Sequence, residues 1–309
     1  MTNLAIKPGR RLPRSTLNYF AEVARCGSVR QAADRLYVAG SAVSRQIAKL
    51  EQYVRTPLFE RRAGGMHLTE AGKLLSFYLQ RTDRELDRAL SAIDDLRGLK
   101  SGEVSISSVE GMIDDFLPSV IESFRRRYPG IFFHVKIQSA LSVVEDIASD
   151  QSDIGIGFNV PKRKNLVVVA KHSQPIIAVC SPKHPLAKNR KLTLAQLNQY
   201  PLALLDTTFG TRRLVDDAFA RSRLPQQAIV VTNSILMLKS LAKRGGVVTL
   251  LPSFSVQNQV RHRELVAIPT NNLILNSAHL DLCVHNLKSL SSAATEFLDL
   301  LKRELATLV

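Results

Sequence analysis

Residues 27–72 of the chain read GSVRQAADRLYVAGSAVSRQIAKLEQYVRTPLFERRAGGMHLTEAG. Apolar side chains recur at helical spacing on both sides of a short glycine-containing turn at 37–40, which predicts two helices that meet there. Ser28 and Gln31 fit a capping box at the start of the first helix, and the second helix is predicted from about Ser41 to Val54. Two short helices, a tight turn and a basic glycine hairpin are typical of a DNA-reading winged helix-turn-helix.

Polar and cationic side chains lie on the face of the second helix opposite its apolar stripe. Hydroxyls and cations near a helix start suit phosphate and base-edge contacts. The alternative for each charged residue is a solvated face without a ligand, but the helix-turn-helix setting favours contact with DNA. The predicted DNA-binding residues are Arg30, Gln31, Gly40, Ser41, Ser44, Arg45, Lys49, Arg61 and Arg62.

The charge distribution agrees with a nucleic-acid partner for the first part of the chain. Residues 1–62 hold twelve Lys or Arg residues and four Asp or Glu residues. The resulting net charge of +8 is more than half of the formal net charge of +15 of the whole chain. Residues 63–100 are neutral overall, and the remaining excess is spread over 101–309. Cations concentrated in the first fifth of the chain would neutralise phosphates there.

The same segment resembles the N-terminal domain of LysR-type transcriptional regulators over about forty-five residues. The matching motifs are Ala32-Ala33, Leu36, Ala42-Val43-Ser44-Arg45-Gln46-Ile47, Leu50-Glu51, Pro57-Leu58-Phe59-Glu60-Arg61 and Leu68-Thr69-Glu70-Ala71-Gly72. The family commonly has Ser-Gln where this chain has Ala39-Gly40, so the helix cap is expected at Gly40 or Ser41. The family's usual glycine after the second helix is Arg55 here. The resemblance implies a winged helix-turn-helix domain over 12–69, with the helix-turn-helix at about 29–48.

A long helix is predicted after Thr69, which is a plausible N-cap. Its apolar positions repeat at spacings of four and three, the pattern of a coiled-coil seam. One alternative is a face packed on the chain's own core, but no other element is predicted nearby, so self-association is favoured. In the resembled family the linker helix dimerises in this way. The predicted linker spans 70–98, and its dimerisation residues are Leu75, Leu79, Leu86, Ala89, Ile93 and Leu96.

From Glu103 onward, short apolar strands alternate with amphipathic helices, which predicts two α/β lobes with mainly parallel sheets. This region resembles the family's effector-binding domain, which is built like a periplasmic solute-binding protein. The whole chain is therefore predicted to be an α+β multidomain protein with an effector-binding domain at 101–309. With crossings placed near Lys171 and Asn286, lobe I comprises 101–171 and 287–309, and lobe II comprises 172–286.

The effector is expected between the lobes, at the carboxyl ends of strands and the starts of helices. Free N–H groups and hydroxyls there favour a carboxylate or a similar anion, whereas Glu110 favours an amine or hydroxyl elsewhere on the ligand or disfavours a strongly anionic one. Each serine could equally be an ordinary N-cap. The predicted effector residues are Ser107, Ser108, Val109, Glu110, Ser139, Ala140, Phe209, Gly210, Thr211, Asn233 and Ser234.

Enzymatic motifs are not found. The sequence has no Walker loop, no Gly-x-Gly-x-x-Gly after a strand and no Gly-x-Ser-x-Gly elbow. Its seven His lack metal-ligand spacing, so no metal and no cofactor are expected. His279 and Asp281 lie two apart in an expected strand, and a shared solvated face is favoured over a catalytic pair. The three Cys favour a reducing compartment without disulfides, and the N-terminal residues lack the apolar stretch of a signal peptide. A cytoplasmic location is therefore expected.

These observations predict a sequence-specific DNA-binding transcriptional regulator that is modulated by a small-molecule effector. Its expected partners are double-stranded DNA, a second copy or a tetramer of itself and, by family resemblance, RNA polymerase. Two alternatives remain. One is a redox-responsive regulator using Cys180 and Cys283, which are expected in strands of the same lobe. The other is an exported solute-binding protein, which the N-terminal DNA module disfavours.

Overall fold

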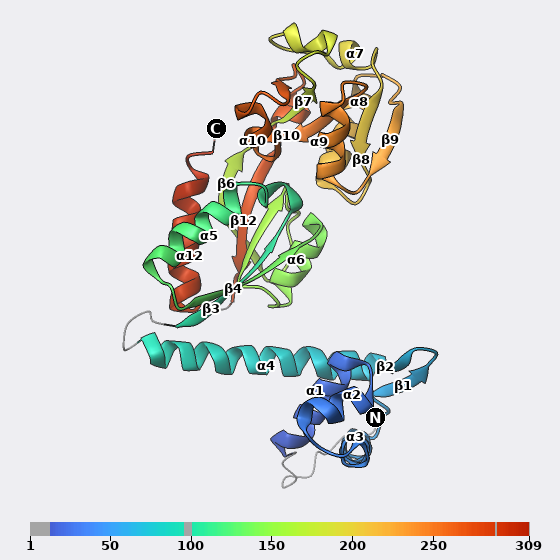
Figure 1. Cartoon of the computed structure of the whole chain (residues 1–309), viewed down its shortest axis with the longest axis vertical. Coiled ribbons are helices and arrows are strands. Elements are labelled where there is room, and N and C mark those ends of the chain that lie inside the picture. Colours follow the sequence, from blue (N-terminus) through green and yellow to red (C-terminus); the bar gives the residue numbers. More distant parts are fainter. Residues whose placement is uncertain (1–12, 96–100, 288, 309) are drawn as a thin grey trace. The chain divides into compact units, whose positions relative to one another are not determined.

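The computed structural model describes residues 13–95, 101–287 and 289–308, which divide into two compact units, 1–89 and 90–309. The first unit contains α1 (Arg14–Cys26), α2 (Val29–Leu36), α3 (Gly40–Val54), the hairpin β1 (Phe59–Arg62) and β2 (Gly65–Leu68), and the greater part of α4 (Glu70–Asp95). This is the element order predicted for a winged helix-turn-helix followed by a long helix (Figure 1).

One apolar core holds the first unit together. Its fully buried members come from all three short helices and from the start of the hairpin: Phe20, Val23, Ala32, Ala33, Val43, Ile47, Leu50, Leu58 and Phe59. The apolar stripes of the sequence therefore meet as expected. The three helices end at residues in the left-handed conformation, Gly27 (φ 63°), Tyr37 (φ 54°) and Arg55 (φ 57°), which stops each helix where glycine is the usual choice.

In the second unit, lobe I is built on a five-stranded sheet of order β4-β3-β5-β12-β6. The strands are β3 (Gly102–Ser108), β4 (Ile131–Ile137), β5 (Ile154–Phe158), β6 (Leu166–Ser173) and β12 (His279–His285). The helices α5 (Phe116–Arg127) and α12 (Ser292–Leu305) lie side by side on one face, and α6 (Ala140–Ala148) covers the other (Figure 1). A short 3-10 turn, η1 (Glu110–Met112), follows β3.

Lobe II has a second five-stranded sheet of order β11-β7-β10-β8-β9. Its strands are β7 (Ile176–Cys180), β8 (Leu202–Leu205), β9 (Ala228–Thr232), β10 (Val248–Pro252) and β11 (Val266–Ile268). Its helices are α7 (Leu194–Leu197), α8 (Gly210–Arg221), α9 (Ile235–Lys243), α10 (Gln257–Arg261) and α11 (Leu273–Asn276), with 3-10 turns η2 (Pro185–Lys188) and η3 (Ser253–Val256).

Side-chain alternation decides which helix covers which face of the lobe II sheet. In β7, Ile177 and Val179 share a core with α9, whereas Ile176, Ala178 and Cys180 share a core with α8. Successive residues of a strand point to opposite faces, so α8 and α9 lie on opposite sides of the sheet. The sheets of both lobes are mainly parallel, as the alternating pattern predicts, with β7 and β12 as the antiparallel strands.

The predicted lobe boundaries are wrong at the second crossing. Strand β12 pairs with β5 and β6 of lobe I, although the sequence analysis assigns residues 279–285 to lobe II. The chain crosses at 174–175 and again at 277–278, where Gln174 N donates to Ala278 O (2.9 Å). The first crossing also lies slightly beyond Lys171. A strand's own pattern does not reveal which sheet it joins, because either lobe can bury its side chains.

Candidate nucleic-acid interface and interlobe cleft

The predicted DNA-contacting side chains share the exposed surface of the first unit. Arg30, Gln31, Ser41, Ser44, Arg45, Lys49, Arg61 and Arg62 are all exposed, and Gly40 is half-buried at the start of α3. Four of the exposed residues lie on α3, opposite its buried stripe of Val43, Ile47 and Leu50. On the hairpin, Arg62 forms an ion pair with Glu60 (2.5 Å). The face is therefore polar, cationic and open to solvent.

The start of α3 differs from the expectation. The N-cap is Ala39, in an extended conformation (φ −70°, ψ 141°), and not Gly40 or Ser41. Alanine has no side-chain oxygen, and α3 has no side-chain cap hydrogen bond. Its first backbone N–H groups are thus not taken by a cap, which leaves a partial positive charge where a phosphate could bind.

Glu51 is a positioning residue that the sequence analysis did not single out. Its carboxylate on α3 accepts hydrogen bonds from Leu58 N (2.8 Å) and Phe59 N (3.2 Å) at the base of the hairpin. The hairpin also donates from Met66 N to Gly27 O (2.8 Å), next to the α1–α2 turn. These bonds hold the basic hairpin at a defined place beside α3. Its position within a Leu-Glu motif was the only signal for Glu51.

The long helix α4 begins as predicted, because Gly72 N donates to Thr69 Oγ1 (3.1 Å). The expectation of one continuous free seam is wrong at its N-terminal end. Leu75 and Leu79 pack against the core of the first unit, since the short helices supply the neighbouring surface that the sequence analysis did not place there. Farther along, Leu86 (38 % exposed) and Ile93 (57 %) are open to solvent, as is Ala89; Leu96 lies outside the described residues.

Many of the predicted effector residues are covered by the chain itself. Six of the eleven are buried: Ser107, Ser108, Val109, Ala140, Gly210 and Thr211. Ser107 Oγ already accepts a hydrogen bond from Gln138 Nε2 (2.6 Å), and Ser139 caps α6 by accepting from Ser142 N (3.2 Å). The accessible members are Glu110, Ser139, Phe209, Asn233 and Ser234.

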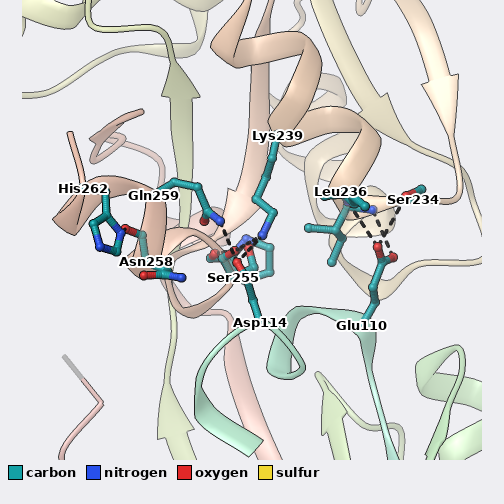
Figure 2. Close-up of polar contacts among 11 residues, drawn as sticks. Glu110, Asp114, Ser234, Leu236, Lys239, Ser255, Asn258, Gln259 and His262 are labelled. Carbon is teal, nitrogen blue, oxygen red and sulfur yellow. Dashed lines mark hydrogen bonds and ion pairs between the residues drawn. The ribbon is translucent and has the colours of Figure 1, made fainter. Parts of the chain in front are cut away.

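Glu110 and Ser234 are brought together across the lobes, which the sequence analysis did not foresee. The Glu110 carboxylate accepts hydrogen bonds from Ile235 N (3.0 Å), Leu236 N (3.1 Å) and Ser234 Oγ (3.4 Å) at the start of α9 (Figure 2). These partners are separated by 124 to 126 positions in the chain. A carboxylate at a helix start is stabilised by the N–H groups and the helix dipole.

A second acidic residue of lobe I, Asp114, also contacts lobe II. Its carboxylate accepts from Gln259 Nε2 (2.6 Å) and from the buried Lys239 Nζ (2.8 Å), and Lys239 also donates to Ser255 O (3.3 Å) (Figure 2). The hydrogen bonds from Gln259 and Lys239 lower the pKa of Asp114 below its usual value. The carboxylate stays charged at neutral pH and ties the segment after β3 to α9 and α10.

Close backbone approach adds to these polar contacts. A methyl group at Gly111 of lobe I would meet the Phe254 ring at 2.5 Å, and one at Gly210 of lobe II would meet Phe158 O at 3.1 Å. The rings of Phe158 and Phe254 lie 5.9 Å apart. A side chain at position 111 would therefore clash with Phe254, and one at position 210 would make a tight contact. The two lobes approach closely here, and part of the predicted cleft is filled by the chain itself.

A cavity of about 710 Å³ lies on lobe I outside this contact region. It is lined by α5 and β4 residues and by Ile113, and none of the eleven predicted effector residues lines it.

The two strand cysteines are not in the same lobe, which corrects the expectation behind the redox alternative. Cys180 lies in β7 of lobe II and Cys283 in β12 of lobe I, and both are fully buried. Burial raises the pKa of Cys180 to about 11 and, with the nearby Asp281 charge, that of Cys283 to about 12. Both thiols are therefore protonated at neutral pH and poorly suited to oxidation.

Thiol titration checks this conclusion. At pH 8 a pKa of about 11 leaves roughly one thiol in a thousand ionised, so native protein treated with a disulfide reagent should react at Cys26 alone. After denaturation all three cysteines should react. Fewer than three thiols in a denatured, previously oxidised sample would revive the redox alternative.

The expectation of a solvated face is wrong for Asp281. It is 1 % exposed, accepts from Val160 N (2.8 Å) and pairs with His279 Nε2 (3.2 Å). Burial raises its pKa. Both partners of Asp281 belong to lobe I, so the pair lies within that lobe, just after the second crossing.

No described helix is long and apolar enough to cross a membrane. No group of three or more His, Cys, Asp or Glu side chains within 13–95, 101–287 and 289–308 is arranged to hold a metal ion.

Two family models match the chain, one for each unit. Residues 15–73 match the bacterial regulatory helix-turn-helix protein, lysR family, and residues 97–306 match the LysR substrate binding domain. Together these matches include α1 to α3, the hairpin, both sheets and all of the interlobe contacts described above.

Curated relatives and solved structures match over nearly the whole length. The chain is 28 % identical to the HTH-type transcriptional activator CmpR of Synechocystis, covering 91 % of this chain and 92 % of CmpR. It is 27 % identical to the transcriptional activator protein LysR of Escherichia coli, with coverages of 85 % and 86 %. Full-length CbnR, solved in complex with its target DNA, has the same fold, with a TM-score of 0.70, 19 % identity and coverages of 95 % and 100 %.

Proposed function

The chain belongs to the LysR family of transcriptional regulators, and from this membership we infer the role of each of its parts. It is a DNA-binding regulator whose activity is modulated by a small-molecule effector, and oligomeric assembly is typical of the family. We propose that residues 12–69 bind DNA, that the helix at 70–98 joins two copies, and that the two lobes beyond residue 101 sense the effector.

The observation that carries this proposal is the exposed cationic face of α3 and the β1–β2 hairpin. Helix α3 presents Ser41, Ser44, Arg45 and Lys49 to solvent and has an uncapped start at Ala39. Such a helix suits the major groove, with its first turn near a phosphate. Arg61 and Arg62 of the hairpin would contact the sugar-phosphate backbone of the DNA beside the groove. Arg30 and Gln31 at the start of α2 would also contact the DNA backbone.

For the effector we propose the region between the lobes. The accessible side chains there are Ser139 at the start of α6, Phe209 at the start of α8, and Asn233 with Ser234 before α9. Binding would add contacts with the effector to the present interlobe contacts, so it would alter how firmly the lobes are held together. We further propose that the protein acts in the cytoplasm and has no catalytic activity of its own.

A selection experiment tests the DNA-binding half of this proposal. The full chain should retain, from a pool of random duplexes, sequences that contain two related half-sites about one or more helical turns apart. Recovered duplexes with no shared sequence, bound equally well as the input pool, would contradict sequence-specific binding.

A ligand screen tests the effector half. A compound that binds the folded full chain raises its melting temperature as its concentration increases. We expect at least one small metabolite to do so and also to change the affinity for the selected duplex. A ligand that stabilises the protein without any effect on DNA binding would argue against its being an effector.

A further inference from the structure

The start of α9 is a complete anion site, and the chain's own Glu110 occupies it. Helix α9 is nine residues long, and Ser234 is its N-cap. Glu110 reaches this point from η1 of lobe I, and its two carboxylate oxygens accept from Ile235 N and Leu236 N at 3.0 and 3.1 Å (Figure 2). The carboxylate thus lies where a bound anion would lie at a helix start.

Each backbone donor at the start of α9 already has an acceptor. Ser234 N donates to Thr232 Oγ1 (3.2 Å), Met237 N donates to Ser234 Oγ (3.2 Å), and Leu238 N donates to Ser234 O (3.3 Å). Glu110 takes the two remaining N–H groups, those of Ile235 and Leu236. A second anion would find no amide donor here and would meet the negative charge of Glu110.

The fold holds Glu110 in this position. Four residues further on, Asp114 pairs with Lys239 of the same helix at 2.8 Å, and Lys239 is only 8 % exposed. Between them, Gly111 lies against Phe254, where a side chain would not fit. The segment from Glu110 to Asp114 is therefore attached to α9 at two points and to η3 between them.

We propose that Glu110 is a specificity-determining residue, a built-in carboxylate that excludes anionic effector groups from the α9 end of the cleft. This inference rests on the proposed binding of an effector between the lobes. The effector group that faces Ser234 and Asn233 is neutral or cationic. An effector carboxylate, where there is one, binds at the start of α6 or α8, next to Ser139 or Phe209.

Chemical rescue tests the proposal on the full chain. Glu110→Ala removes the γ-carbon and the carboxylate, a fragment with the atoms of acetate, and so leaves the anion site empty. Sodium acetate, titrated against chloride at constant ionic strength, should raise the melting temperature of this variant by about 2–4 °C in a saturable way. Neutral acetamide, which has the same shape, should have a clearly smaller effect because it carries no charge for the helix start.

Three matched proteins should not respond to acetate. In the wild type the site is filled, and in Glu110→Gln it is filled by a neutral side chain of the same size. In Asp115→Ala a different interlobe carboxylate, paired with Arg261 at 3.4 Å, is removed. Asp115 is the N-cap of α5, but its side chain makes no hydrogen bond to that helix start, so its removal vacates no anion site. No acetate-specific rise in folded Glu110→Ala, or an equal rise in the wild type, would overturn the proposal.

Should Glu110→Ala not fold, the wild-type protein still decides the question. Hydrogen exchange at the amides of Ile235 and Leu236 should be the same with and without acetate, since Glu110 holds both. Protection of these amides by acetate would mean that the site is open and the proposal wrong. Neither measurement uses DNA or an effector, so a negative result here leaves the proposed regulatory function standing.

Discussion

The double variant Leu86→Glu, Ile93→Glu should be a monomer and should bind its selected duplex roughly 10²–10⁴-fold more weakly than the wild type. Both side chains lie exposed on the part of α4 beyond the first unit's core, 38 % and 57 % accessible. They are seven residues apart and so lie on one face of the helix. Apolar side chains in such a seam are buried when two helices associate, and carboxylates placed there repel each other.

The loss of affinity follows from the loss of pairing. Two linked recognition helices bind two half-sites as one event, whereas a monomer holds a single half-site. Light scattering gives the mass, and anisotropy with a labelled duplex gives the affinity. A dimeric mass for the double variant would exclude this seam as the dimer contact.

A control variant separates the seam from added charge. Gln80→Glu with Arg81→Glu adds two carboxylates about 120–140° around the helix from Leu86 and Ile93. This variant should remain dimeric. If it also dissociates, general repulsion along α4 and not the loss of a specific seam would explain the result.

Arg45→Ala should weaken binding to the selected duplex by about 1–3 kcal/mol, roughly 5- to 150-fold, if the guanidinium reads a base edge. Arg45 is exposed on α3 near its first turn, and no carboxylate of the described residues pairs with it. Its charge is thus free to meet DNA. If it contacts a phosphate instead, affinity should fall equally for all duplexes, and the slope of log affinity against log salt should decrease by about 1 per contact.

Titrations at several salt concentrations, with the selected and a scrambled duplex, distinguish these two roles. Arg25→Ala is the matched control, because Arg25 lies on α1 and is paired with Glu22 at 2.5 Å. That hydrogen-bonded pair lowers the pKa of Glu22. Removing Arg25 should leave DNA affinity unchanged. An Arg45→Ala protein with wild-type affinity for both duplexes would remove Arg45 from the interface.

Sequence patterns were most informative where structure is local. The capping serine Ser28, the stripe of Val43, Ile47 and Leu50, and the cap at Thr69 all depend on residues three or four positions apart, and the structure has all three. Of the predicted capping box, the structure gives the hydrogen bond from Gln31 N to Ser28 Oγ. The cap of α3 was misplaced by one or two residues because alanine carries no capping signal. The pattern predicts a free seam at Leu75 and Leu79, which pack on the first unit's core, because it shows an apolar face but not what covers that face.

The sequence by itself determined the winged helix-turn-helix, the long helix and the two α/β lobes, because hydrophobic period and capping are encoded within a few residues. Only the tertiary structure decided which sheet β12 joins, and that Cys180 and Cys283 lie in different lobes. It also decided that Glu110 fills the start of α9. That contact joins residues 124 to 126 positions apart, and such a pairing depends on how the chain crosses between lobes, which no local pattern records.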